Sequence, residues 1–208
     1  MDGKVKSMDL SRKEPVEEII SKLTAEQRRL LYLIGLYSEV EGEVGKQWLK
    51  DLSLKGILVK GVREKVFDWD YAPASIMYRN TRKVINISQE GQNDLNTLRT
   101  YGLIARLRLG TSRHFYFNAY GLTAEGVEVF SAIPQEDREP IEKLISCPKC
   151  GKLYEVIPEE DSIYLTCEKC DIQINTEVDD IEAVAYMCVP KWLRMKIETV
   201  WKPVTRRE

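Results

Sequence analysis

The 208-residue chain contains a single histidine, His114, and lacks the motifs of several common enzymes. A lone histidine cannot build a metal site that needs several imidazoles, and no nucleophile–base pattern accompanies it. Two residues separate the glycines of Gly42-Glu43-Val44-Gly45-Lys46, whereas a Walker A loop needs four, and no GxGxxG string occurs. We therefore expect that the protein is not an enzyme.

Long apolar runs are also missing. No stretch of about 18 apolar residues exists, so no membrane-spanning helix is expected. The first residues lack the apolar core of a secretory signal, and we expect a cytoplasmic protein. In that reducing compartment the five cysteines indicate metal binding or packing rather than disulfides.

The net charge of −2 hides a strong segregation of charge along the chain. Residues 79–120 carry a net charge of +5, residues 134–182 carry −9, and residues 183–208 carry +4. Charges further apart than about 8–10 Å are screened by salt, so the local field decides whether phosphate is attracted. The central stretch is therefore a candidate nucleic-acid surface, while the acidic stretch suits a basic protein partner.

Four of the five cysteines form two Cys-x-x-Cys pairs separated by sixteen residues: Cys147, Cys150, Cys167 and Cys170. Each pair is typical of a tight turn that directs two thiolates at one point, and two such turns complete a tetrahedron. Strands are predicted at 153–157, 163–166 and 172–175. The pattern resembles the zinc ribbon family over residues 143–178, which implies one structural Zn²⁺ held by all four thiolates. The fifth cysteine, Cys188, lies in an apolar run and is expected to be a packed thiol.

A helix, a β-hairpin and another helix are predicted between residues 84 and 133. A short strand at 84–87 precedes Ser88, which can cap a helix over 89–101, and Gly102 can end it. Leu95, Leu98 and Tyr101 are expected to face inward from this helix. Thr123 can cap a final helix that runs to about residue 132.

The predicted hairpin consists of residues 103–109 and 113–118, which alternate between two faces. One face is expected to carry Leu107, Leu109, Phe115 and Phe117. The other is expected to carry Arg106, Arg108, His114 and Tyr116.

Two strings in this region carry a family resemblance: Leu98-Arg99-Thr100-Tyr101-Gly102-Leu103-Ile104 and Tyr120-Gly121-Leu122-Thr123-Ala124-Glu125-Gly126. They resemble the winged-helix family of DNA-binding domains, most closely MarR- and PadR-type regulators. The resemblance implies that 89–101 is a recognition helix in the major groove and that the hairpin is the wing. The residues that it implies for nucleic-acid contact are Gln92, Asn93, Asn96, Arg99, Arg106, Arg108 and Arg113. Asn and Gln can read adenine, whereas Arg can read guanine or hold phosphate.

These patterns predict an α+β fold made of a winged-helix domain over 14–133 and a small zinc ribbon. Helices are expected at 15–23, 24–40 and 45–54. An insertion near 55–84, holding a short helix at 72–79 or an added hairpin, departs from the winged-helix family. A polar linker is expected at 134–142. An amphipathic helix is expected within 179–208; it can dock on the chain's own body, form a homodimer or bind a partner.

The pairing of these modules is similar to that in the archaeal transcription factor E family, as an analogy of architecture. Our first hypothesis is a DNA-binding transcription regulator that contacts duplex DNA and meets a protein partner through its zinc ribbon or C-terminal helix. The alternative is a non-enzymatic adaptor in a transcription or other nucleic-acid complex. A nucleic-acid enzyme using magnesium at Asp68 and Asp70, or at Asp179 and Asp180, is the weakest reading, because no further ligand pattern accompanies them.

Overall fold

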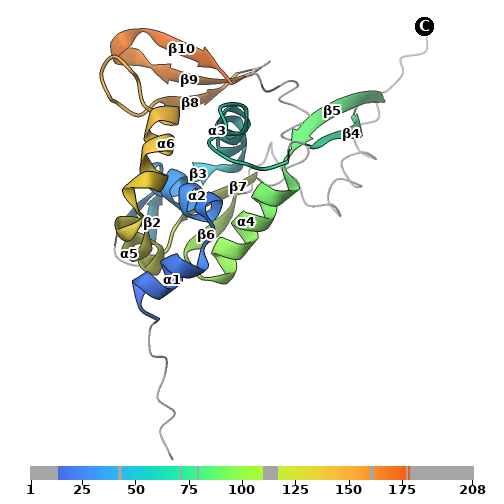
Figure 1. Ribbon diagram of the computed structural model, residues 1–208. Helices are drawn as coiled ribbons and strands as arrows, with labels where there is room; N and C mark the ends of the chain where they lie inside the picture. Colours follow the sequence, from blue (N-terminus) through green and yellow to red (C-terminus); the bar gives the residue numbers. More distant parts are fainter. Residues whose placement is uncertain are drawn as a thin grey trace, which may run out of the picture.

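The computed structural model describes residues 14–41, 44–70, 72–78, 80–109, 117–159, 162–176 and 178. Over these residues the fold is α+β, with six α-helices and several small antiparallel sheets (Figure 1). The predicted C-terminal helix, together with Cys188, lies outside the described residues.

The helices, in chain order, are α1 (Val16–Lys22), α2 (Ala25–Leu36), α3 (Asp51–Arg63), α4 (Gln89–Thr100), α5 (Ala124–Ala132) and α6 (Gln135–Ile145). The first strands are β1 (Glu39–Glu41), β2 (Val44–Gln47), β3 (Leu49–Lys50), β4 (Ala72–Tyr78) and β5 (Thr81–Ile87). The remaining strands are β6 (Ile104–Leu109), β7 (Phe117–Leu122), β8 (Glu155–Pro158), β9 (Ile163–Cys167) and β10 (Ile172–Asn175).

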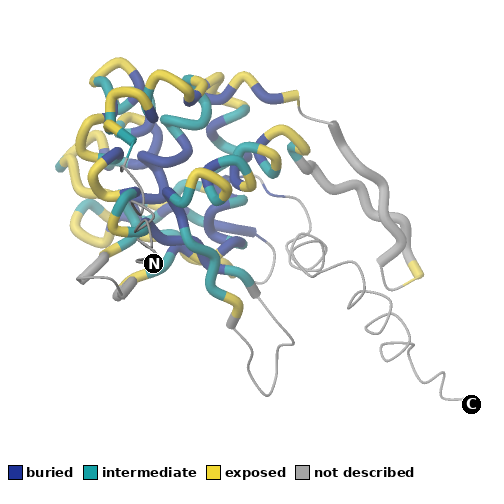
Figure 2. Tube along the Cα trace, turned by 90° about the horizontal axis from the view of Figure 1, so that it is seen from below, coloured by how far each residue is buried: buried dark blue, intermediate teal, exposed yellow. Residues whose placement is uncertain are grey.

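A three-stranded sheet of order β3-β7-β6 forms one side of the core. Helices α2 and α3 contact β7, and α4 contacts both α2 and β6. The buried side chains gather between these helices and the sheet, whereas exposed residues lie mainly at the outer turns (Figure 2).

Helix α2 supplies the centre of the core. Its N-terminus has a complete capping box, because the Thr24 hydroxyl accepts from the backbone N–H of Gln27 and the Gln27 side chain accepts from Thr24. Leu30 and Ile34 are fully buried. The helix ends at Leu36 rather than near Val40, because the chain turns into β1 at Glu39.

The helix predicted at 45–54 is wrong. Residues 44–47 and 49–50 are strands, and α3 begins only at Asp51. Leu49 is buried in β3 and pairs with Tyr120 of β7, a partner that lies far away in sequence. Tertiary pairing therefore overrides the helical spacing of the local apolar residues.

The region predicted as an insertion contains most of α3 and then an antiparallel hairpin of β4 and β5, in register from Ala72 with Ile87 to Tyr78 with Thr81. Of the two structures left open for this region, the hairpin is confirmed. The predicted strand at 84–87 is the second half of β5.

Helix α4 matches its prediction closely. Ser88 caps it by accepting from the backbone N–H of Gly91, and Gly102 has a φ of 72°. Leu95 and Leu98 are buried as expected. Tyr101 is 38% exposed, so its predicted inward position is wrong: the helix ends at Thr100 and Tyr101 is its C-cap.

The start of α5 is tied to the strand that follows α4. The Thr123 hydroxyl donates to the carbonyl of Gly102 and accepts from the N–H of Gly126. A Cβ atom on Gly126 would lie 1.9 Å from the carbonyl oxygen of Leu103, so only glycine allows this approach. The two strings that carry the family resemblance therefore meet in space.

The predicted polar linker at 134–142 is also wrong, because residues 135–145 form α6. Asp137 is buried and forms ion pairs with Arg28 at 2.5 Å and Arg29 at 3.4 Å, which join α6 to α2. Ile141 and Ile145 are buried in the same core. Proline and charge suggest a linker, but Pro140 falls inside a helix whose apolar face is covered.

The C-terminal sheet, of order β10-β9-β8, confirms the three strands predicted around the cysteines. It packs on α3, which contacts both β8 and β9. Leu165 belongs to the same buried cluster as Leu30, so the core is continuous between the helical part and this sheet.

Replacing Gly126 by alanine is expected to lower the free energy of unfolding by about 1–3 kcal/mol, because the added methyl group forces backbone apart. Thermal unfolding should show the midpoint falling by several degrees. Val127→Ala in the same helix, at a position that is 37% exposed, is the control and should be near neutral. An unchanged midpoint for Gly126→Ala would refute the close approach.

Candidate metal centre and nucleic-acid interface

The first cysteine turn follows α6 directly. The N–H of Cys147 donates to the carbonyl of Lys152, and the N–H of Gly151 donates to the carbonyl of Cys147, both at 2.8 Å. Gly151 has a φ of 70°, a conformation that glycine adopts without strain. These bonds close the loop so that Cys147 and Cys150 face the same side.

The second turn repeats this design at the end of β9. Cys167 is the last residue of the strand, and a short 3₁₀ turn carries the chain to Cys170. Asp171, which follows, has a φ of 50°, so a left-handed residue comes after each pair. The sequence pointed to Gly151 for this role but not to Asp171, since aspartate tolerates the conformation less conspicuously.

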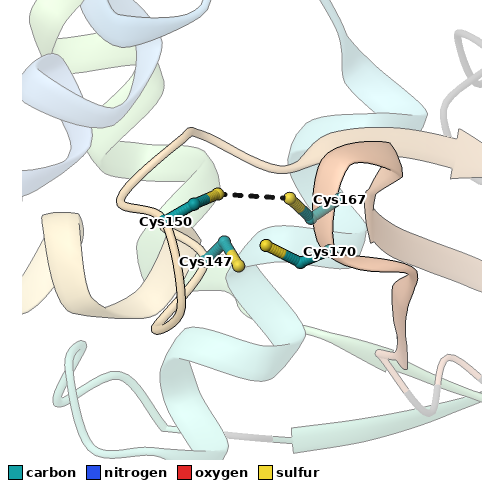
Figure 3. Close-up of side chains that lie close together, drawn as sticks. All are labelled: Cys147, Cys150, Cys167 and Cys170. Carbon is teal, nitrogen blue, oxygen red and sulfur yellow. Dashed lines mark hydrogen bonds between the residues drawn. The ribbon is translucent and has the colours of Figure 1, made fainter.

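The four sulfur atoms converge, as the spacing predicted (Figure 3). All lie within 4.8 Å of one another, and the Sγ atoms of Cys150 and Cys167 are 3.6 Å apart. A tetrahedral ion with sulfur ligands at about 2.3 Å needs sulfur atoms about 3.8 Å apart. A disulfide would need about 2.05 Å. The four cysteines could therefore hold one metal ion.

The surroundings of the thiols favour a cation. Burial opposes ionisation of Cys147, but the backbone N–H groups of Lys149 and Cys150 donate to its sulfur and lower its pKa to about 7. The Cys150 side chain, followed by burial, raises the pKa of Cys170 to about 12. Burial also raises the pKa of Cys167. Four neighbouring thiolates repel one another, and a bound cation would remove that repulsion.

This centre is built into the core. Cys147 and Cys167 are only 1% and 4% exposed. Tyr154 is buried beside them, its N–H donates to Ile145, and its carbonyl accepts from the Tyr37 hydroxyl at 2.8 Å. Over the described part of the chain, no other group of histidine, cysteine and acidic residues has metal-binding geometry. Asp68 and Asp70 are exposed and belong to no such group.

The outer face of α4 carries a stripe of amides and hydroxyls. Its exposed members, at helical spacing, are Gln89, Asn93, Asn96 and Thr100. Of the residues proposed for nucleic-acid contact, Asn93 and Asn96 lie on this stripe, whereas Gln92 and Arg99 are half-buried at its sides. Gln89 and Thr100 complete the stripe, and the helical period alone could have found them.

The two acids of α4 are engaged by the rest of the chain. Asp94 accepts from the side chain of Gln27 at 2.8 Å and from the indole N–H of Trp69 at 3.0 Å. Glu90 accepts from the backbone N–H of Asp70 at 2.6 Å. The carboxylates are thus bound by donors of α2 and of the segment after α3, which lessens their repulsion of an approaching phosphate.

Three arginines come together where α4 and β6 meet. Burial, followed by the nearby charges of Arg99 and Arg108, lowers the pKa of Arg106. Arg108 is exposed and Arg106 is half-buried. Arg113 and His114 lie outside the described residues.

The hairpin faces differ from expectation. Arg106 pairs with Tyr120, and Ile104 pairs with Leu122, so these residues share one face of the sheet. Ile104, Tyr120 and Leu122 are buried, while Leu107 on the other face is half-buried. The arginine face therefore covers the helices near its base. The sequence could not show this, because alternation separates two faces without saying which is inside.

Asp51 is a buried acid that the sequence did not single out. It is 3% exposed at the start of α3, and its charge acts on Arg106. One of its carboxylate oxygens has no hydrogen-bond partner among the described residues. It partly offsets the positive field of the arginines. No helix in the described part of the chain combines the length and apolarity needed to cross a bilayer.

A family model named for the uncharacterized protein MJ1567 matches residues 26–175, which is most of the chain. The chain belongs to the MJ1567 family. The match runs from α2 to β10 and so contains the arginines, the α4 stripe and all four cysteines. Neither the curated proteins nor the solved structures that were compared gave a match.

Removing one thiolate is expected to abolish binding of the ion and to destabilise the core that surrounds it. Cys150→Ser should lower the metal content from one ion per chain to none, measured by elemental analysis, and should lower the thermal midpoint. Cys188→Ser is the matched control and should keep both values. Metal-free wild-type protein of normal stability would contradict a metal centre here.

Proposed function

We propose that the protein is a DNA-binding transcription regulator in which α4 and the β6–β7 hairpin contact duplex DNA. The observation that carries this proposal is the convergence of Arg99, Arg106 and Arg108 beside the amide stripe of α4. Guanidinium groups attract phosphate, and amides can read base edges. Together they form a surface with both kinds of contact that specific recognition needs.

The order of the elements supports a winged-helix reading of this unit. In that family, helices are followed by a hairpin wing, and a short strand near the first helices completes its sheet. Here α2, β3, α3, α4, β6 and β7 follow one another, and the sheet order is β3-β7-β6. The hairpin insertion between α3 and α4 is the main departure.

Helix α4 has suitable dimensions and chemistry for the major groove. An α-helix with its side chains is about 10–12 Å wide, and the groove is about 12 Å wide. Asn93 and Asn96 are exposed on its outer face and can pair with adenine edges. Arg99 and Arg108 flank that face and would hold the backbone phosphates.

We assign the metal as one Zn²⁺ with a structural role. Four thiolates complete its tetrahedron and leave no position for a substrate. The ion would fix both turns and thereby hold the sheet of β8, β9 and β10 against α3. The acidic charge of this region and the exposed apolar residues Leu153 and Ile157 suit contact with a protein partner.

The salt dependence of DNA binding tests the function. The logarithm of the association constant should fall by about 0.9 for each phosphate contact per tenfold rise in salt. Replacing Arg99, Arg106 and Arg108 by glutamine should reduce the slope by up to about 2.7, because three such contacts are lost. Fluorescence anisotropy with labelled duplex from 50 to 300 mM salt would measure it.

A matched control removes three charges from the metal-binding region instead: Lys149, Lys152 and Lys169, each replaced by glutamine. These residues are exposed near the cysteine turns, and their loss should leave the slope unchanged. Wild-type protein without DNA affinity that co-purifies with a protein would favour the adaptor function. Equal slopes for both triple variants would refute the assigned surface.

A further inference from the structure

The hairpin of β4 and β5 interrupts the two helices that would otherwise be joined by a short turn. It enters after Asp70 and leads directly into Ser88, the cap of α4. Each strand has seven residues, and at about 3.3 Å per residue the hairpin is about 23 Å long. In Figure 1 it extends away from the helical body at the N-terminal end of α4.

The charge of this segment is of one sign. Residues 71–89 contain no aspartate or glutamate, although the chain as a whole has 33 acids. The same residues contain three basic positions, Arg79, Arg82 and Lys83. Asp70 and Glu90 are the acids that bound the segment on either side. The uniform sign suits a polyanion and opposes a basic surface.

The base of the hairpin is fixed to α4 by contacts among buried and half-buried residues. Trp69 stacks on Phe67 with centroids 4.2 Å apart and donates its indole N–H to Asp94. It also packs against Gly91, where a Cβ atom would lie 3.0 Å from the ring. The N–H of Asp70 binds Glu90. The strands therefore leave the body from the first turns of α4 in a defined direction.

The shape of the segment fits nucleic acid. A two-stranded ribbon is strongly twisted, and the major groove of B-DNA admits such a ribbon as well as a helix. β4 and β5 have each other as their main contact, and an isolated two-stranded hairpin is marginally stable in water. A surface that supplies further contacts would stabilise it.

We propose that the β4–β5 hairpin is a second DNA-contacting arm, which binds the phosphate backbone next to the segment read by α4. This inference rests on the proposed function and adds to it, because helix and wing alone would cover a shorter site. The arm leaves from the N-terminal end of α4, while β6 follows the opposite end. Arm and wing would then contact the duplex on either side of the helix.

The test removes the basic residues of the described part of the hairpin, with Arg82→Gln and Lys83→Gln combined. Losing two phosphate contacts should reduce the salt slope by up to about 1.8, so the affinity gap to wild type narrows about tenfold between 50 and 200 mM salt. Hydroxyl-radical footprinting should show a shorter protected site. Lys149→Gln with Lys169→Gln is the matched control and should match wild type.

The outcomes separate the two claims. If wild type binds DNA and the hairpin variant, folded by circular dichroism and with unchanged metal content, has the same slope and footprint, the arm is refuted and the proposed function stands. If wild type has no affinity for DNA, both fall. If the variant keeps its DNA affinity but loses self-association in analytical ultracentrifugation, the hairpin binds a second copy and the proposed arm is overturned.

Discussion

The carboxylate of Asp94 joins three parts of the chain that are distant in sequence. It receives hydrogen bonds from Gln27 of α2 and from Trp69 of the segment after α3, while it belongs to α4 itself. A carboxylate in a half-buried position needs such donors, since leaving it unpaired costs free energy. This arrangement orients α4 against α2 and fixes the base of the β4–β5 hairpin. The same two bonds occupy an acid on a helix whose outer face is otherwise free of acids except Glu90, which is also bound.

The metal centre and the arginine surface depend on one continuous core. α3 contacts β7 on one side and the strands of the cysteine region on another. Asp137 of α6 adds ion pairs with α2 just before the first cysteine turn. An ion held by the four thiolates would therefore stabilise the packing of α3 as well as its own turns. The two candidate sites are chemically independent, yet each is positioned by the same helix.

Burial sorts the charged groups into structural and exposed sets. Asp51 and Asp137 are buried acids that face arginines within the fold. Arg108 and the amides of α4 remain exposed and can meet an outside partner. Net charge alone gives no access to this division, because a residue counts equally whether its charge is offset internally or faces solvent.

The sequence by itself determined the elements whose signals are local. The capped helix at α4, the strands of the cysteine region and the convergence of Cys147, Cys150, Cys167 and Cys170 follow from caps, alternation and turn spacing. Only the tertiary structure decided that residues 44–50 are strands, that 135–145 are helical and that the arginine face of the hairpin lies inward at its base. These outcomes depend on partners such as Tyr120 for Leu49 and Arg28 for Asp137, which lie about 70 and 110 residues away. A short window of sequence contains no trace of such partners, whereas the free energy of burial and pairing that they supply exceeds local propensity.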